Sequence, residues 1–393
     1  MHPTLTTLQL VVEIVAVAGI VSSSLYYFLC LWSASVFLSE RDRPRDAQLT
    51  QDLPPVSILK PLKGIDPEIY QSFRSHCLQD YPEYEIIFGV SDPNDPAIAS
   101  VKALQQEFPQ HKIQLVVCPD ILGANVKVSN LAQMLALARY DHLIVNDSDI
   151  RVEADYLQRI IAPLADPRIG MVTCLYRGVA GATLGSRLES LGISTDFSAG
   201  VLAARQLEGG IHFGLGSTLA FRRSDLERIG GFPSIVDHLA DDYELGARLA
   251  ALGLQVKLSD VVVETFLPPY RLAGFFAHQL RWARGVRDAR AGGYFGLIFT
   301  FGILWALLAL VASHGALWSW GSVAFVLLLR LSVALVVGGK ILRDRTVLND
   351  LWLIPLRDLI AVAVWLISLG GHTVTWRGER FQLKDGKLTR LTR

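Results

Sequence analysis

The sequence predicts an α/β protein with a mostly parallel sheet, attached to a membrane by apolar helices at both ends. Between residues 51 and 269, short strand-like runs alternate with helically spaced segments, a pattern typical of parallel strands joined by right-handed crossovers. Long uncharged stretches flank this region. Hydrophobic residues make up 51% of the 393 residues, which is high for a purely soluble protein, and membrane segments account for the excess.

The first membrane segment covers residues 8–38, where Glu13 is the only charged side chain. It exceeds the ~20 residues that cross a bilayer and lacks the basic start of a signal peptide, which predicts a permanent anchor over residues 1–40. No Lys or Arg precedes it, whereas three arginines follow it in residues 41–45. The positive-inside rule therefore predicts an outside N-terminus and places residues 51–269 in the cytosol.

A C-terminal membrane region is predicted over residues 294–371. Residues 295–318 and 323–337 form two apolar spans joined by a short uncharged loop, which we expect outside. Arg330 interrupts the second span. A charge at this depth is costly unless it faces protein or snorkels to the interface.

A third apolar segment, at residues 351–369, leaves two topologies open. It contains Pro355, Arg357 and Asp358, which weaken it as a membrane span. If it crosses, the basic tail at residues 372–393 lies outside, against the positive-inside tendency. If it lies in the interface, the tail stays inside.

Charge and cysteine spacing exclude other classes of protein. The net charge is zero and no basic block stands out, so we expect no nucleic-acid partner. Cys30, Cys77, Cys118 and Cys174 show no metal-ligand spacing, which predicts reduced thiols without a disulfide framework or a zinc site.

Aspartates follow two of the predicted strands at the edge of the sheet where ligands bind. The apolar run at residues 143–145 stops at Asn-Asp-Ser-Asp, which contains Asp147 and Asp149, and the strand at residues 85–90 is followed by Asp92. Aspartates two residues apart suit a divalent cation that also binds phosphate oxygens. A polar turn that caps a helix explains the same residue types.

An acidic group opens a predicted helix that begins in the segment HLADDYEL at residues 238–245. Asp241, Asp242 and Glu244 lie in its first turn, where the helix dipole favours negative charge. The functional alternative is that one of them acts as a general base.

Two further segments have the character of interfacial helices. Residues 184–206 are mostly apolar and weakly amphipathic, and suit a position near a lipid substrate. Residues 270–293 contain HQLRWARGVRDAR, in which Trp282 lies among four arginines. This amphipathic segment suits a membrane interface, and its guanidinium groups equally suit a diphosphate.

The motifs together resemble family 2-type glycosyltransferases with a GT-A fold, and within them the ceramide glucosyltransferase-like branch, which includes bacterial hopanoid glycosyltransferases. The six motifs that carry the resemblance are KPLKGIDPEI at 60–69, DYPEYEIIFGVSDPNDPAI at 80–98, GANVKVSNL at 123–131, NDSDIRV at 146–152, HLADDYELG at 238–246 and HQLRW at 278–282. The resemblance covers most of the chain and implies a GT-A catalytic domain over residues 51–269.

The resemblance also implies roles for single residues. Asp242 matches the catalytic base, and Gln279, Trp282 and Arg284 lie where the family contacts the diphosphate or the acceptor. His278 departs from the family pattern, which has Gln or Arg at this position. The residues implied in donor binding are Asp92, Lys127, Asp147 and Arg281, with Asp147 and Asp149 holding the diphosphate through Mg²⁺ or Mn²⁺.

The implied function is transfer of one sugar, glucose or N-acetylglucosamine, from a UDP-sugar to a hydroxyl of ceramide or a hopanoid, with inversion at the anomeric carbon. A processive polysaccharide synthase shares these motifs, but few spans are available for a polymer channel. A non-catalytic lipid-binding or scaffold protein is disfavoured because all four motif aspartates are present. We expect an integral protein of a bacterial inner membrane, and nothing in the sequence indicates an oligomeric state.

Overall fold

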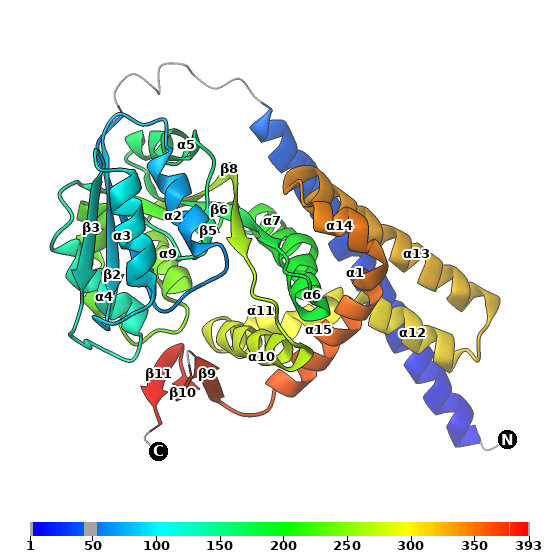
Figure 1. The fold of residues 1–393 in the computed structure, drawn as a ribbon. Coiled ribbons are helices and arrows are strands. Elements are labelled where there is room, and N and C mark those ends of the chain that lie inside the picture. Colours follow the sequence, from blue (N-terminus) through cyan, green and yellow to red (C-terminus); the bar gives the residue numbers. More distant parts are fainter. Residues whose placement is uncertain (1–2, 43–52, 377, 392–393) are drawn as a thin grey trace. The chain divides into compact units, whose positions relative to one another are not determined.

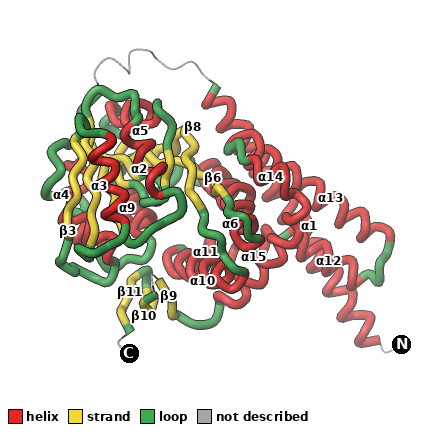
Figure 2. Tube along the Cα trace, viewed as in Figure 1, coloured by secondary structure: helices red, strands yellow, loops and turns green. Residues whose placement is uncertain are grey.

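The computed structural model describes residues 3–42, 53–376 and 378–391 (Figures 1 and 2). The chain divides into two compact units, here called the helical unit and the sheet unit. The helical unit comprises Met1–Asp42, Ala182–Gln206 and Pro269–Val374, and the sheet unit comprises Arg43–Gly181, Leu207–Pro268 and Thr375–Arg393. This division differs from the sequence-based one at two places, because residues 182–206 join the helical unit and most of the C-terminal tail joins the sheet unit. Arg43 and Arg45, on which the predicted orientation partly depends, lie outside the described residues.

The sheet unit contains an eight-stranded mixed sheet in the order β3-β2-β1-β4-β7-β6-β8-β5. Its strands are β1 (Val56–Leu62), β2 (Tyr84–Val90), β3 (Lys112–Val117), β4 (His142–Val145), β5 (Ile150–Arg151), β6 (Ile169–Val179), β7 (Leu219–Arg222) and β8 (Gln255–Phe266). Strands β1 to β4 are parallel, as are β6 and β8, whereas β7 runs antiparallel to both its neighbours and β5 to β8. The predicted mostly parallel α/β sheet is therefore confirmed.

Helices cover both faces of this sheet. They are α2 (Ile69–Cys77), α3 (Ala97–Glu107), α4 (Val126–Leu135), α5 (Tyr156–Ile161), α8 (Arg223–Arg228) and α9 (Asp241–Ala251). On β2, Phe88 packs against Phe73 of α2, with ring centroids 4.6 Å apart. The next residue, Gly89, faces Met134 of α4 so closely that a Cβ atom would lie 2.3 Å from its sulfur. Because successive strand residues point to opposite faces, α2 and α4 lie on opposite sides of the sheet.

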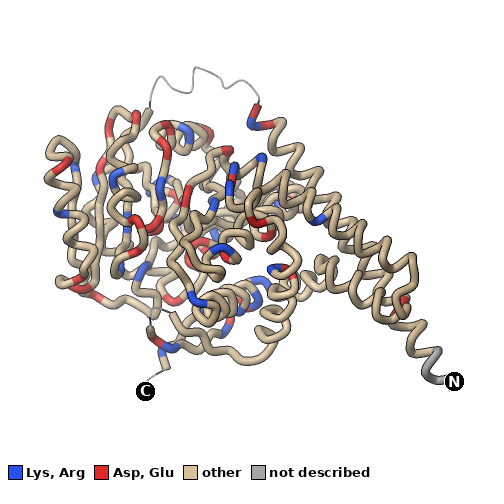
Figure 3. Tube along the Cα trace, turned by 45° about the vertical axis from the view of Figure 1, so that its right-hand side comes forward, with Lys and Arg blue, Asp and Glu red and all other residues tan. Residues whose placement is uncertain are grey.

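The helical unit consists mainly of α-helices. They are α1 (Pro3–Arg41), α6 (Leu184–Gly192), α7 (Ser198–Leu207), α10 (Leu272–Ala289), α11 (Ala291–Gly296), α12 (Gly302–Ala312), α13 (Leu317–Ala334), α14 (Arg345–Asp350) and α15 (Ile354–Ser368). Charged side chains are sparse along the helix that begins at the N-terminus (Figure 3). Thr7–Arg41, Leu317–Ile341 and Arg345–Ser368 are long and apolar enough to cross a membrane, and α11 and α12 are a bent pair that together pass the same test.

The segment predicted as one apolar span at residues 295–318 is bent, and α11 and α12 form a broken pair of helices. A 3₁₀ helix, Leu297–Thr300, follows α11, and the helical structure is interrupted at Phe301. The axis of α12 is bent by 48° relative to the helical segment before Phe301. The freed carbonyl groups find partners in this unit: Ser22 of α1 donates to the Phe299 carbonyl at 3.1 Å and Trp305 donates to the Ile298 carbonyl at 2.8 Å. Hydropathy could not reveal the break because the residues on both sides are equally apolar.

The next span begins at Leu317, six residues before its predicted start, and ends in π-helical turns at Leu335–Ile341. Arg330 lies in its interior and faces protein. Its guanidinium donates to both carboxylate oxygens of Asp358 on α15, at 2.8 and 2.9 Å, and to the Thr195 carbonyl at 3.1 Å. Arg330 and Asp358, two of the charged residues that interrupt the apolar segments, thus neutralise each other.

Arg330→Met is expected to destabilise the protein strongly, because it leaves the Asp358 carboxylate buried without its partner. Breaking a buried ion pair from one side costs about 3–5 kcal/mol, whereas replacing both partners by apolar residues is often neutral. Thermal unfolding in detergent should therefore show a large drop in Tm for Arg330→Met and recovery of most of it in the double variant Arg330→Met, Asp358→Leu. A double variant no more stable than the single one would contradict this.

Candidate active site

Two carboxylates meet around Gly216 in the sheet unit. Asp147 follows β4, and Asp242 is the second residue of α9. The Gly216 amide donates to Asp242 Oδ2 at 2.7 Å, and a Cβ atom on Gly216 would lie 3.1 Å from Asp147 Oδ2 and 3.1 Å from Asp242 Oδ2. A side chain at this position would push into both carboxylates. The glycine-rich segment before β7 therefore allows the backbone to approach them.

The Asp242 carboxylate is fixed from two sides. In addition to Gly216, its Oδ1 accepts a hydrogen bond from the Tyr243 amide at 2.8 Å. Burial, followed by repulsion from Asp241, raises the pKa of Asp242 to about 6, although Lys127 opposes this rise. A carboxylate with a raised pKa is a stronger base than an ordinary aspartate, and Asp242 is oriented by backbone groups alone.

Asp149 lies deeper than Asp147 on the same loop. Its Oδ2 accepts a hydrogen bond from the Thr265 hydroxyl of β8 at 2.5 Å. Burial, and then the nearby Asp147 carboxylate, raises the pKa of Asp149 to about 6. The loop is also tied from outside, because the Ser148 hydroxyl donates to Asp66 at 2.5 Å.

Lys127 of α4 joins the two acidic segments. Its ammonium lies 2.8 Å from Asp147 Oδ1 and 3.1 Å from Asp241 Oδ2. Burial alone would lower the pKa of Lys127, but the carboxylates of Asp147, Asp241 and Asp242 outweigh it and hold the pKa above its usual range. The lysine therefore stays charged and holds the loop of Asp147, Ser148 and Asp149, here called the DSD loop, to the start of α9.

Lys60 is another cation of this site, and no role was predicted for it from the sequence. It lies in β1, is fully buried, and its ammonium donates to the Asp147 carbonyl oxygen at 3.0 Å. Burial lowers the pKa of Lys60 to about 7 although Asp149 and Asp147 raise it. The available signal was a lysine inside an apolar strand, where an ionisable residue needs a partner.

Asp92 lies beyond the end of β2 and is exposed. Its Oδ1 accepts the Asn94 amide at 2.8 Å, which makes a local turn. The preceding Ser91 hydroxyl donates to Asn130 of α4 at 2.8 Å, so the helix that carries Lys127 also holds the strand end that carries Asp92.

The HQLRW motif belongs to α10 in the helical unit, where a fully buried glutamate, Glu189 of α6, binds its first two residues. His278 Nδ1 lies 3.1 Å from the Glu189 carboxylate, and the Gln279 amide donates to it at 2.9 Å. The oxygen of Gln279 accepts a hydrogen bond from Arg357 of α15 at 2.9 Å. Both side chains are thus engaged within this unit.

Aromatic rings extend this arrangement along α10. His278 stacks on Tyr270 with centroids 5.6 Å apart, and its ring lies 5.2 Å from that of Trp282. Trp282 in turn lies 6.1 Å from Phe197. His278, which departs from the family pattern, therefore supports Trp282 and is held by Glu189.

Arg284 binds the segment that follows α15. Its guanidinium donates to the carbonyls of Thr373 and Gly370 at 2.6 and 3.0 Å. The neighbouring Arg287 donates to the Gly371 carbonyl at 2.8 Å and also to the carbonyl of Ser368, the last residue of α15. The two arginines thus hold the segment after α15 against α10.

The predicted site residues therefore divide between the two units. The sheet unit contains Asp92, Lys127, Asp147, Asp149 and Asp242, and the helical unit contains Gln279, Arg281, Trp282 and Arg284. In the sheet unit, the structure brings Lys127, Asp147 and Asp242 together around Gly216.

The C-terminal tail is a further part of the sheet unit that sequence reasoning missed. Its strands are β9 (Thr373–Trp376), β10 (Glu379–Lys384) and β11 (Lys387–Arg390), which form a small separate sheet. The Leu388 amide donates to the Asp237 carbonyl at 2.6 Å, and the Leu239 amide donates to the Gly386 carbonyl at 3.0 Å. The hairpin thus pairs with the loop that enters α9. The sequence signal was Asp-Gly between alternating strand residues, a strong hairpin pattern.

Leu388→Asp is expected to slow turnover, because it places a charge at a buried position of the hairpin and weakens the pairing that holds the loop before Asp242. Leu388 is 3% exposed, and burying an unpaired polar group costs at least about 1–3 kcal/mol. The neighbouring Thr389 is exposed, so Thr389→Asp is the matched control. Equal kcat values for the two variants would contradict a role of the tail at the site.

The sheet topology and the acidic loops at its edge define a glycosyltransferase fold of the GT-A type. A solved structure, the mannosyltransferase PcManGT from Pyrobaculum calidifontis in complex with GDP-Man and Mn²⁺, matches 90% of this chain and 98% of its own, with a TM-score of 0.54 and 20% sequence identity. The predicted GT-A fold is confirmed by this likeness.

The chain belongs to glycosyl transferase family 21, whose model matches residues 15–389. Ceramide glucosyltransferase 3 of Caenorhabditis elegans is 23% identical over 395 residues, which cover 96% of this chain and 82% of that protein. A ceramide glucosyltransferase of Komagataella phaffii is 38% identical over 113 residues, or 28% of this chain and 22% of that protein. The predicted membership of the ceramide glucosyltransferase-like branch, and with it the class of enzyme, is confirmed.

Proposed function

We propose that this protein transfers one sugar from a UDP-sugar to a hydroxyl group of a neutral membrane lipid, with inversion at the anomeric carbon. Family membership and the ceramide glucosyltransferases among its relatives support this proposal. Glucose and ceramide are the first donor and acceptor to test, because the relative that aligns over most of this chain is named for them. N-acetylglucosamine and hopanoids are the second pair.

The observation that carries the proposal is that the carboxylates of Asp242 and Asp147 both lie close to one residue, Gly216. A Cβ atom on Gly216 would lie 3.1 Å from an oxygen of each. One carboxylate can therefore serve the acceptor while the other serves the donor diphosphate a few ångströms away. A direct displacement needs both carboxylates close to the reacting carbon, one for the nucleophile and one for the leaving group.

In the proposed reaction, Asp242 accepts the proton of the acceptor hydroxyl as its oxygen attacks the anomeric carbon. A bond forms from this oxygen to the sugar, and the bond from the sugar to UDP breaks, with the electron pair leaving on UDP. The hydrogen bonds from Gly216 and Tyr243 hold the carboxylate in place during proton transfer. No covalent bond between sugar and protein is formed.

The residues present fit a divalent cation at the DSD loop. The carboxylates of Asp147, Asp241 and Asp242 lie near one ammonium group, that of Lys127, and the Asp149 carboxylate lies close enough to Asp147 to interact with its charge. Oxygen ligands are those that Mg²⁺ and Mn²⁺ prefer. Among the described residues no group of three or more His, Cys, Asp or Glu side chains forms a complete metal site. We therefore propose Asp147 and Asp149 as its protein ligands, with diphosphate oxygens completing the shell. A bound cation would neutralise charge on the departing diphosphate.

The remaining predicted residues receive proposed roles according to their contacts. Asp92 is proposed to contact the uridine, and Arg281 and Trp282 to contact the diphosphate and the acceptor. Gln279 and Arg284 already bind Glu189, Arg357 and backbone carbonyls within the helical unit, so we propose that they hold α10 in position.

UDP release by the purified protein in detergent tests this function. The assay combines UDP-glucose or UDP-N-acetylglucosamine with ceramide or a polyhydroxylated hopanoid, in Mg²⁺ or Mn²⁺. One lipid should stimulate release severalfold over the lipid-free rate. Release that no lipid stimulates, with product that grows into a polymer, would favour the processive synthase.

The ends of the helical segment Pro269–Val374 support a proposal for the membrane topology. Both β8 before it and β10 and β11 after it belong to the sheet unit, so we propose that the segment leaves and returns on one side of the membrane and crosses it an even number of times. We propose that the bent pair and α13 are the two crossings. On this account residues 345–368 lie at the cytosolic interface, and the catalytic unit and the C-terminus are both cytosolic.

Cysteine labelling in intact cells is expected to show this topology. The exposed residue Leu317 lies at the proposed outside turn, and Leu391 lies at the end of the tail. Leu317→Cys should react with a membrane-impermeant maleimide, whereas Leu391→Cys should react only after permeabilisation. The four native cysteines are buried and give a low background. Labelling at position 391 in intact cells would overturn the proposed topology.

A further inference from the structure

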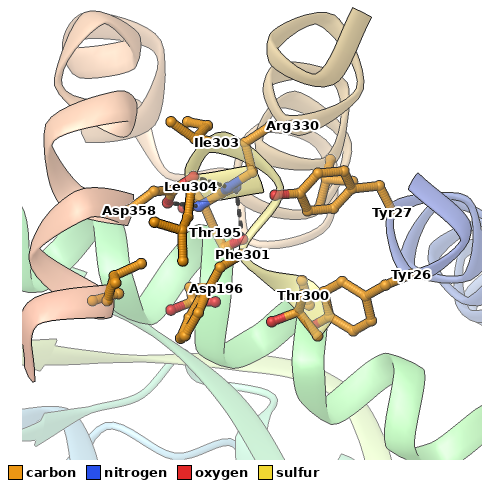
Figure 4. A pocket seen from close by; sticks show the side chains of 14 residues that line it. Tyr26, Tyr27, Thr195, Asp196, Thr300, Phe301, Ile303, Leu304, Arg330 and Asp358 are labelled. Atoms are coloured by element: carbon orange, nitrogen blue, oxygen red, sulfur yellow. Dashed lines mark hydrogen bonds and ion pairs between the residues drawn. The ribbon is translucent and has the colours of Figure 1, made fainter. Parts of the chain in front are cut away.

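A cavity inside the helical unit combines polar and apolar walls (Figure 4). Its lining comes from α1, the segment between α6 and α7, the start of α12, α13 and α15. Arg330 reaches Asp358 and Thr195 on one side, whereas Asp196, Thr300 and Tyr26 lie on the other. The proposed base, Asp242, and the proposed metal ligands, Asp147 and Asp149, do not line this cavity, so it has no proposed part in the chemical step.

Two interruptions of regular helix border the same cavity. Ile193–Phe197 forms a π-helical turn that contains Asp196, and the break between Leu297–Thr300 and α12 places Thr300 and Phe301 in the wall. π-Helical turns are frequent at functional sites. Irregular backbone among membrane helices is tolerated where protein buries it or where it lines a polar cavity. Both helix interruptions therefore support a binding role for this cavity.

Asp196 offers hydrogen-bonding capacity that the surrounding residues leave open to a ligand. Its side chain is 52% exposed, and its ion pair with Arg357 is long, at 3.9 Å. On a water-facing surface such a carboxylate needs no ligand. Here it lies in the wall of a cavity bordered by three helices that are apolar enough to span a membrane, where an ionisable side chain is a candidate binding residue.

The charges of the cavity select the kind of ligand. Arg330 and Asp358 neutralise each other, and Asp196 is the third charged residue of the lining, with Arg357 at 3.9 Å as a distant partner. The lining residues therefore carry no net positive charge for an anionic head group, whereas a hydroxyl or amide group can donate a hydrogen bond to the Asp196 carboxylate. The cavity is partly open and has a volume of about 30 Å³, so it admits one or two such groups while the rest of a lipid stays outside.

We propose that this cavity binds a hydroxyl or amide group of a neutral lipid other than the hydroxyl that reacts, with Asp196 as its hydrogen-bond acceptor and the apolar walls contacting the nearest methylene groups. The inference rests on the proposed function in one respect, since the lipid is taken to be the sugar acceptor. Tyr26 and Thr300 supply further hydroxyls, and the ion pair of Arg330 and Asp358 closes one side.

The experiment measures acceptor and donor parameters separately in two cavity variants. Asp196→Asn weakens the acceptor, and Ala361→Leu fills space from α15 without changing charge. Each variant should raise KM for the lipid about tenfold and leave UDP affinity unchanged, Asp196→Asn because it weakens a hydrogen bond to a charged group and Ala361→Leu because it occupies the space of the bound group. Glu13→Gln is the matched control, because Glu13 lies on α1 and does not line the cavity. Unchanged lipid KM in both cavity variants would overturn the proposal.

Photocrosslinking separates this proposal from the proposed function. A photoactivatable ceramide is incubated with the Asp242→Asn variant, and labelled peptides are identified by mass spectrometry. Label in α1, α12 or α15 that free ceramide competes away and an anionic phospholipid does not would support the cavity even if no sugar is transferred. Label elsewhere, with normal transfer by the wild type, would refute the cavity and leave the proposed function standing.

Discussion

Asp242→Asn is expected to abolish sugar transfer while UDP binding stays nearly unchanged. The substitution keeps the shape of the side chain and leaves one oxygen to accept a hydrogen bond from either the Gly216 or the Tyr243 amide, which bind different oxygens of the Asp242 carboxylate. It removes the proposed general base. General-base catalysis contributes about 10²–10⁴-fold to a rate, and kcat should fall by that factor. Lys127 would still bind Asp147 and Asp241, so the donor side of the site should persist.

The matched control for this prediction is Asp241→Asn. Asp241 precedes Asp242 in the same helical turn but binds Lys127, and its side chain is buried. Its replacement should lower kcat much less than that of Asp242. Near wild-type turnover in Asp242→Asn, or equal losses in the two variants, would show that the base has been assigned to the wrong carboxylate.

Asp149→Ala should weaken metal-dependent UDP binding by about tenfold or more, because we propose that the diphosphate is held through a cation at this carboxylate. UDP binding is measured by calorimetry with Mn²⁺ and again with a chelator. The substitution should reduce the first affinity and leave the second as it is in the wild type.

Ser148→Ala controls for disturbance of the loop. Its hydroxyl binds Asp66 and lies between the two carboxylates in sequence, but it has no proposed part in metal binding. It should retain the metal dependence of UDP binding. If Asp149→Ala bound UDP as tightly as the wild type in Mn²⁺, the proposed metal ligand would be wrong.

The sequence predicted those parts of the fold that local pattern determines. β2 and β4 are apolar runs that end at aspartates, so both the strands and the acidic edge were visible without a structure. The resemblance then connected Asp147 with Asp242, which are far apart in the chain. Their approach to Gly216 was not visible, because it depends on the packing of three loops.

The features that were missed depend on contacts distant in sequence. Glu189 binds His278 and Gln279, which lie about ninety residues later, and its burial could not be read from a glycine-broken amphipathic stretch. Likewise, the tail pairs with the loop before α9 across about one hundred and fifty residues. In both cases a short local motif was present, but its partner was defined only by the fold.

The most direct test of the central claim is the identity of the lipid product. Purified protein is incubated with UDP-glucose, Mn²⁺ and ceramide, and the lipid extract is analysed by mass spectrometry and NMR. The account predicts ceramide carrying one hexose in the β configuration, inverted from the α-linked donor, and no product with Asp242→Asn. A retained α linkage, a chain of several sugars, or an unchanged yield with Asp242→Asn would contradict a single inverting transfer that depends on this carboxylate.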